Sequence, residues 1–327
     1  MRPYLAAALL FAAPALAAPR VATDIGPVHS IAAQVMEGVG APDLLIQVEA
    51  SPHDYALRPS EARALQDAQI VFWIGEALTP WLERSIDNLA SDAEVVELLG
   101  AGGSQVLPNR TTAIFEHRDV LHEDHDGEDH EDHAHGDDDH VKHAGEETGH
   151  DHHGHDGADP HAWLNPDNAS AWADLIAGTL AKADPANAAK YAANAAAAKA
   201  RIEADTEALL RRLDAVRGKQ FVVFHDAYQY FERRFGAPSA GALSISNARK
   251  PSPARLTAIR AHVAENSITC IFAEPQFNAG IVTAVSEGAN VKPGVMDPLG
   301  SANAPGPDFY GALLDDLAAA FVECLTE

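Results

Sequence analysis

Residues 116–159 carry histidine and carboxylate side chains at a density that suits metal binding. Twelve of the 17 histidines lie in this segment, together with 17 acidic residues and only two basic ones. Imidazole and carboxylate groups are ligands that divalent transition metals take up. The segment has too little apolar content to offset the entropy of ordering its backbone. We therefore expect a solvated, mobile loop in a protein that handles a metal ion.

Outside this segment, three further histidines lie where strands are expected to end or in loops. His53 follows the apolar run LLIQVEA, His161 lies in DPHAWLNPDNA, and His225 ends FVVFH. Asp297 ends the run NVKPGVMD. Ligands collect outside the carboxyl ends of parallel strands, so we expect these side chains to meet in a cleft. Three imidazoles and one carboxylate would form a four-coordinate zinc site.

Such a site requires strands that end at common edges, and the rest of the chain predicts them. Short apolar runs alternate with segments of helical period, which is typical of parallel sheets flanked by helices. We expect strands at residues 21–25, 44–50, 70–75, 93–100, 220–226, 267–275 and 290–298. We expect helices at residues 28–39, 59–66, 166–182, 253–265, 278–287 and 309–325, and another that begins at residue 227.

An alanine-rich segment separates the two groups of strands. Residues 184–218 begin with Asp-Pro and continue with strong helix formers. Roughly 30 helical residues span about 45 Å, so we expect a rigid helix that joins two lobes; an ordinary surface helix is the alternative. The predicted organisation is an N-terminal α/β lobe at 19–183, a linking helix at 184–218 and a C-terminal α/β lobe at 219–327.

The first residues have the pattern of a secretory signal. Arg2 precedes an apolar stretch at residues 4–13, and Ala15-Leu16-Ala17 fits the rule for signal cleavage. The stretch is shorter than the roughly 20 residues that cross a bilayer. We expect residues 1–18 to be removed and the mature protein to lie in the periplasm; an uncleaved anchor is the alternative.

Two cysteines, Cys270 and Cys324, remain in this predicted exported protein. An even pair in an oxidising compartment suggests a disulfide, and two free buried thiols are the alternative. A bridge would close a loop of about 55 residues and stabilise the fold by about 4 kcal/mol in the chain-entropy model.

The net charge of −25 is concentrated in one place. The segment 116–159 contributes 17 acidic minus two basic residues, or −15, which leaves −10 for the rest of the chain. This balance argues against nucleic acid and against anionic membrane surfaces as partners, and it favours cations.

Five motifs occur in an order that resembles one protein family: SPHDYALRPS, IVFWIG, DPHAWLNPDNA, VFHDAYQYF and IFAEPQF. They resemble the ZnuA-type proteins, the zinc-specific, cluster A-I solute-binding subunits of bacterial ABC importers. The resemblance covers essentially the whole mature chain, including the insertion before the DPH motif. It implies two α/β lobes joined by one long helix, with Zn²⁺ bound by His53, His161 and His225. It also matches Cys270 and Cys324 to a disulfide known in members of the family.

The choice of metal and of a fourth ligand follows partly from the resemblance. Manganese-binding relatives carry a carboxylate where this chain has His225, and imidazole favours zinc over manganese. Some zinc relatives are thought to use water, or an acidic residue just before the first histidine, where this chain has Pro52. Asp297 matches the aspartate of other members and is the expected fourth ligand, with Glu274 as the substitute.

The resemblance implies a binding protein and not an enzyme. Its expected partners are an inner-membrane permease with its cytoplasmic ATPase, and other periplasmic zinc-binding proteins are further candidates. We expect a monomer whose lobes close slightly on the ion. The segment 116–159 is expected to capture zinc weakly near the cleft, with a passive tether or a zinc buffer as the alternatives.

Three alternative functions share some of these features. A zinc hydrolase would also use three histidines, but the chain has neither an H-E-x-x-H helix nor a G-x-S-x-G elbow. A periplasmic zinc buffer without a transporter is compatible with the residues. An importer subunit for manganese or copper is the third alternative.

Overall fold

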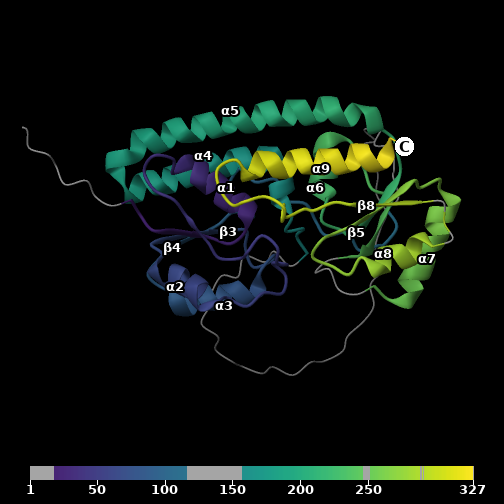
Figure 1. The fold of residues 1–327 in the computed structure, drawn as a ribbon. Coiled ribbons are helices and arrows are strands. Elements are labelled where there is room, and N and C mark those ends of the chain that lie inside the picture. The colour runs from purple at the N-terminus through teal and green to yellow at the C-terminus, as the bar shows by residue number, and fades with distance from the viewer. Residues whose placement is uncertain (1–17, 116–156, 246–250, 288, 290, 327) are drawn as a thin grey trace, which may run out of the picture.

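The structure is a computed structural model that describes residues 18–115, 157–245, 251–287, 289 and 291–326. Almost all of the predicted signal peptide, and residues 116–156 of the histidine-rich segment, lie outside the described residues. The described chain forms two α/β lobes side by side, with a long helix along one side of both (Figure 1). This confirms the predicted fold class.

Each lobe is built on a parallel four-stranded sheet, and the two sheets have the same topology. The N-terminal sheet has the order β2-β1-β3-β4 and the C-terminal sheet the order β6-β5-β7-β8. The first strand of each lobe therefore lies between the second and the third. The strands are β1 (Val21–Thr23), β2 (Asp43–Leu44), β3 (Ile70–Trp73), β4 (Glu94–Glu97), β5 (Phe221–His225), β6 (Gly241–Ser244), β7 (Cys270–Ala273) and β8 (Lys292–Val295).

Helices connect the strands and cover the sheets (Figure 1). They are α1 (Gly26–Val35), α2 (Pro59–Asp67), α3 (Pro80–Leu89), α4 (Pro166–Ala183), α5 (Ala188–Leu213), α6 (Gln229–Phe235), α7 (Pro253–Glu265), α8 (Gly280–Ser286) and α9 (Phe309–Leu325). Short 3-10 turns lie at Ala162–Leu164, Pro185–Asn187 and Asp214–Val216. None of the helices in the described ranges is long and apolar enough to cross a membrane.

Local sequence accounts for several helix starts. Helices α2, α3, α4 and α7 begin with proline, whose fixed φ suits the first helical position and whose missing N–H is not needed there. Asn165 and Ser252 add side-chain caps, since they accept hydrogen bonds from the backbone N–H groups of Asp167 and Arg255.

The predicted strand at residues 44–50 is wrong in extent, because β2 ends at Leu44. The amides of Leu45 and Ile46 still donate to Thr23 and Asp24 of the neighbouring strand region, and the chain then turns away. Leu45, Ile46 and Val48 are buried as a loop over the core. A short apolar run is compatible both with a buried strand and with a buried loop, so the sequence alone does not separate them. Strand β6 and helix α3 were not predicted.

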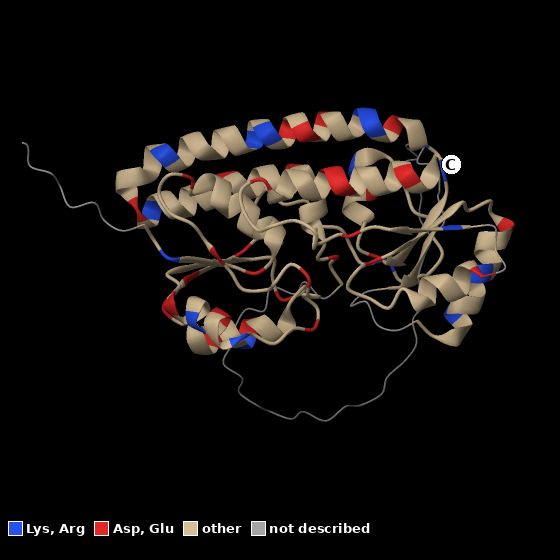
Figure 2. Cartoon of the chain, viewed as in Figure 1, with Lys and Arg blue, Asp and Glu red and all other residues tan. Residues whose placement is uncertain are grey.

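Helix α5 is the predicted linking helix. Its 26 residues, with a 3-10 turn at each end, follow both lobes (Figure 1). Its buried residues recur every three or four positions, as a one-sided packing stripe requires: Tyr191, Ala195, Ala198, Ile202, Thr206, Leu209 and Leu213. Both basic and acidic residues lie along the helix (Figure 2).

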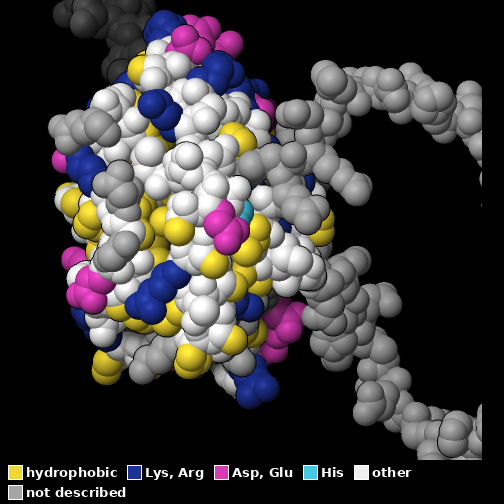
Figure 3. Space-filling model, turned by 90° about the vertical axis from the view of Figure 1, so that its right-hand side faces the viewer, with side chains coloured by type: hydrophobic (Ala, Val, Ile, Leu, Met, Phe, Trp, Pro, Cys, Tyr) yellow, Lys and Arg dark blue, Asp and Glu magenta, His cyan; other side chains and the backbone are white. Residues whose placement is uncertain are grey.

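The lobes also meet through the C-terminal helix. Helix α9 packs against α1 and α5, and the amide of Tyr310 donates to the hydroxyl of Ser30 at 3.0 Å. One hydrophobic core includes Val21 of the first sheet and Phe221 of the second. On the surface at the end of the C-terminal lobe, apolar side chains are mixed with polar and charged ones (Figure 3).

The two cysteines lie at the far end of the C-terminal lobe. Cys270 begins β7 and Cys324 is near the end of α9. Their Cα atoms are 6.0 Å apart, and the structure pairs their sulfur atoms. This spacing suits a disulfide, so the pair is a disulfide candidate that ties the last helix to its sheet.

Candidate metal centre

The structure brings three of the predicted ligands together. The ligand nitrogens of His53, His161 and His225 all lie within 4.8 Å of one another. The ring centroids are 5.5 Å apart for His53 and His161, 5.8 Å for His53 and His225, and 5.0 Å for His161 and His225. No other group of three such ligands is found among the described residues.

Each histidine is placed by a different element, and the three come from both lobes. His225 is the last residue of β5, at the carboxyl end of the second sheet. His161 directly precedes the 3-10 turn that leads into α4. His53 lies in the loop between β2 and α2, where the indole of Trp81 donates to the carbonyl of Pro52 at 2.8 Å.

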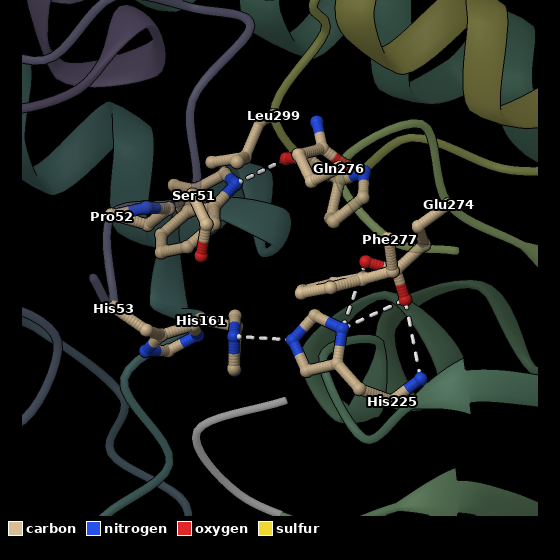
Figure 4. A pocket seen from close by; sticks show the side chains of 11 residues that line it. Ser51, Pro52, His53, His161, His225, Glu274, Gln276, Phe277 and Leu299 are labelled. Carbon is tan, nitrogen blue, oxygen red and sulfur yellow. Dashed lines mark hydrogen bonds and ion pairs between the residues drawn. The ribbon is translucent and has the colours of Figure 1, made fainter. Parts of the chain in front are cut away.

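A buried carboxylate orients the ring of His225. The Nδ1 atom lies 2.7 Å from Oε1 and 2.8 Å from Oε2 of Glu274, whose residue is only 3% exposed. The ring lies between Glu274 on one side and His161 on the other (Figure 4). With its proton on Nδ1, His225 presents the Nε2 lone pair to the cleft.

A second carboxylate does the same for His161. Oδ1 of Asp159 accepts hydrogen bonds from the backbone N–H of His161 at 3.0 Å and from its Nδ1 at 2.7 Å. The Nε2 atoms of His161 and His225 are therefore turned toward each other, 3.1 Å apart. Two nitrogens bound tetrahedrally to zinc at about 2.0–2.1 Å lie about 3.3 Å apart, so this pair is close to a zinc-ligating geometry.

The electrostatics of the three imidazoles differ. Burial lowers the pKa of His53 and of His161 well below the ordinary value, and the neighbouring imidazoles lower both further. Burial also opposes charge on His225, but the charge and hydrogen bond of Glu274 together with the charges of Asp226 and Asp159 outweigh it, so this pKa is raised. The lowered pKa values keep His53 and His161 in the neutral form that binds a metal, whereas His225 holds a proton more firmly and is the ligand at which protons compete most with the metal.

Burial raises the pKa of Asp159 to about 6, against the hydrogen bonds from His161 and Gln229 and the charge of Arg110. The carboxylate remains ionised at neutral pH and able to accept from His161. Burial likewise raises the pKa of Asp226 to about 7.

The cavity between the histidines is small. It encloses about 10 Å³, room for a single water-sized particle. Around the histidines, its lining includes Glu274, Gln276, Phe277, Trp163 and Pro52 (Figure 4). A cavity of this size suits an ion.

Asp297, the expected fourth ligand, lies beside the cavity but does not line it. Its Oδ1 accepts from Gln276 Nε2 at 2.8 Å and from the amide of Leu299 at 2.9 Å. Its Oδ2 accepts from the amide and the hydroxyl of Ser301, both at 2.6 Å. Glu274, named as the substitute, is engaged with His225. The carboxylate of Glu274 therefore orients His225, whereas that of Asp297 accepts hydrogen bonds from Gln276 and from the turn that follows β8.

Sequence reasoning missed the role of Asp159 and Gln229. Asp159 stands two residues before His161 in the DPH motif, so its position was a usable signal. Gln229 donates to Asp159 from 70 residues away, and no sequence pattern indicates such a contact. The carboxylate of Asp226, next to His225 in the sequence, accepts from Arg110 at 2.7 Å.

Comparison with known proteins agrees with this geometry. The sequence model of the family described as "Zinc-uptake complex component A periplasmic" matches residues 21–324. The chain is 45% identical over 333 residues to the high-affinity zinc uptake system protein ZnuA of Paracoccus denitrificans, which covers 98% of this chain and 97% of that protein. It is 41% identical over 328 residues to the protein of the same name from Brucella suis, which covers 99% and 98%.

Solved structures share the fold at lower identity. A crystal structure of ZnuA matches with a TM-score of 0.71 and 21% identity over 94% of this chain and 99% of that one. A mutant structure of the laminin-binding adhesin of Streptococcus agalactiae matches with a TM-score of 0.71 and 23% identity over 94% and 99%. These likenesses show the two-lobed architecture.

Proposed function

Because the chain belongs to the ZnuA family, the periplasmic components of zinc-uptake complexes, we propose that it binds Zn²⁺ between its lobes and delivers it to an ABC permease. Members of this family are metal-binding transport proteins and not enzymes. His53, His161 and His225 are the proposed protein ligands. The observation that carries the proposal is the convergence of their ring nitrogens within 4.8 Å.

The chemistry of the site favours zinc. Three imidazole ligands form a borderline-soft site, whereas manganese prefers oxygen ligands. Glu274 and Asp159 hold two of the rings in the tautomer that presents Nε2, which raises their basicity toward a metal. Competitive titration against Mn²⁺ tests this preference, and tighter binding of Mn²⁺ than of Zn²⁺ would contradict it.

Asp297 is the proposed fourth ligand. It follows β8 at the same edge of the sheet as His225, and Gln276 separates it from the cavity. To reach an ion the carboxylate has to exchange at least one of its present hydrogen bonds for the metal. Slight closure of the lobes is the proposed motion that allows this exchange.

Delivery requires a location and partners. We infer a periplasmic monomer released by cleavage of the signal at residues 1–18, with lobes at 19–183 and 219–327 around the linking helix 184–218. The proposed partners are an inner-membrane permease with its cytoplasmic ATPase, and other periplasmic zinc-binding proteins. Growth of zinc-starved cells with and without the gene separates import from simple buffering of zinc.

Stoichiometry provides the direct test of the site. The parent protein for this test lacks residues 117–157, which removes twelve additional histidines. We expect it to bind one tight zinc equivalent in competition with a chelator. The combined change His53→Ala, His161→Ala and His225→Ala should abolish this equivalent, whereas the control His262→Ala on α7 should keep it. One tight equivalent left in the triple variant would refute the proposal.

A further inference from the structure

The segment that follows β4 leaves the N-terminal lobe and joins the C-terminal one. We call residues 105–115 the strap. Ile114 forms an antiparallel bridge with Gly241 at the edge of the second sheet. The amide of Phe115 donates to Ala240 at 3.0 Å, and the amide of Ala242 donates to Ala113 at 2.9 Å. The strap is thus a second crossing between the lobes, in addition to α5.

The strap also holds the segment that carries His161. Pro108 forms an antiparallel bridge with Ala158. The amide of Asp159 donates to the carbonyl of Leu107 at 2.7 Å. The carboxylate that orients His161 therefore stands on a short two-stranded ribbon of which the strap is one strand.

Helix α6 of the C-terminal lobe fastens both strands of this ribbon. Gln229 Nε2 donates to the carbonyl of Pro108 at 3.0 Å and to Oδ2 of Asp159 at 3.1 Å, so both amide hydrogens are used. The hydroxyl of Tyr230 accepts from the amide of Leu107 at 2.9 Å and donates to the carbonyl of Asp159 at 2.8 Å. Gln229 is only 2% exposed, so water does not compete for these bonds.

An arginine completes the attachment. Arg110 of the strap donates to the carboxylates of Asp226 and Glu232, which both lie in the C-terminal lobe, and its guanidinium lies 4.1 Å above the ring of Phe115. Glu232 and Asp226 are buried. Paired buried charges of this kind resist separation, so the strap remains docked while Gln229 acts on Asp159.

We propose that Gln229 is a positioning residue of the metal site, reaching from one lobe to orient a ligand of the other. Oδ1 of Asp159 faces His161, and Oδ2 is fixed by Gln229, so the plane of the carboxylate is defined at both oxygens. That plane sets the direction of the His161 ring and its 3.1 Å approach to His225. The lobes thereby set the spacing of two ligands before an ion arrives. This inference rests on the proposed zinc site.

The test replaces Gln229 by methionine, which keeps the length and volume of the side chain but removes both donors. Arg234→Met is the matched control, because Arg234 also lies on α6 and forms a cross-lobe ion pair, with Asp167 at 3.1 Å, but does not reach Asp159. The measurements are zinc affinity by chelator competition and the visible absorption of Co²⁺ bound in place of zinc. Co²⁺ absorption reports ligand geometry, which loss of stability alone does not change.

We expect Gln229→Met to weaken zinc binding about 10–100-fold, the usual effect of removing a group that orients a metal ligand, and to shift the Co²⁺ bands. The control should leave both unchanged. Wild-type affinity and spectrum in Gln229→Met would overturn the inference, and so would an equal loss in Arg234→Met. If the methionine variant does not fold, Gln229→Asn, which shortens the side chain by one methylene, is judged by the same two measurements. Failure of the wild type itself to bind zinc tightly would instead overturn the proposed function and this inference with it.

Discussion

The hydrogen bond between Glu274 and His225 leads to a quantitative prediction. Glu274→Gln keeps the size of the side chain but removes the charge that lies 2.7 Å from Nδ1. A hydrogen bond to a charged group contributes about 1.5–3 kcal/mol, and loss of a group that orients a metal ligand typically costs 10–100-fold in affinity. The second range corresponds to about 1.4–2.7 kcal/mol. The two estimates agree, so we expect zinc affinity at pH 8 to fall about 10–100-fold.

The same variant should also change the pH dependence of zinc binding. In the wild type, Glu274 raises the pKa of His225, so protons compete with zinc at His225 first as pH falls. One displaced proton reduces affinity about tenfold per pH unit below that pKa. In Glu274→Gln the lowering effect of burial is opposed less, so the pKa of His225 falls. Protons then begin to compete with zinc at a lower pH. The affinity of the variant should therefore be lower at pH 8 but less pH-dependent down to pH 6.

Chelator-competition titrations of both proteins at several pH values between 6 and 8 measure these effects. Glu265→Gln, at the exposed end of α7, is the control for loss of a carboxylate elsewhere and should match the wild type throughout. If Glu274→Gln had wild-type affinity at pH 8, Glu274 would not orient His225. If its affinity changed with pH as steeply as that of the wild type, Glu274 would not raise the pKa of His225.

Three other outcomes are expected. Reduction of the pair Cys270–Cys324, which are 54 residues apart, should lower the free energy of unfolding by about 4 kcal/mol in denaturant titrations without changing zinc stoichiometry; an unchanged midpoint would mean that the bridge contributes no stability. Asp297→Asn should weaken zinc binding by more than the roughly 100-fold upper limit for an orienting group, because it removes a ligand. A loss below tenfold would mean that Asp297 is not a ligand and only accepts hydrogen bonds in the turn that follows it. Deletion of residues 117–157 should lower the number of weakly bound zinc ions in equilibrium dialysis and slow uptake in zinc-starved cells; no change in either would leave that segment as a tether.

Much of the fold follows from local patterns. Apolar runs flanked by Pro, Gly and polar residues predict most strands, because buried parallel strands need little else from the sequence. The closing helix has the predicted bounds, Phe309–Leu325, since its apolar face is continuous. Strand β6, by contrast, consists of the four residues GALS. This short sequence, with a single large apolar side chain, carries no recognisable pattern, and only pairing with β5 defines it.

The candidate site likewise has one part that the sequence predicts and another that it does not. The sequence by itself predicted the three candidate ligands, because His225 ends a predicted strand at the carboxyl edge of a parallel sheet, where ligands collect, and His53 and His161 lie in loops expected at the same cleft. Only the tertiary structure decided what orients them. His225 meets Glu274 across 49 residues and Asp159 meets Gln229 across 70. Hydrogen bonds depend on distances of a few tenths of an ångström and on direction, and these are set by how two lobes pack and not by any spacing along the chain.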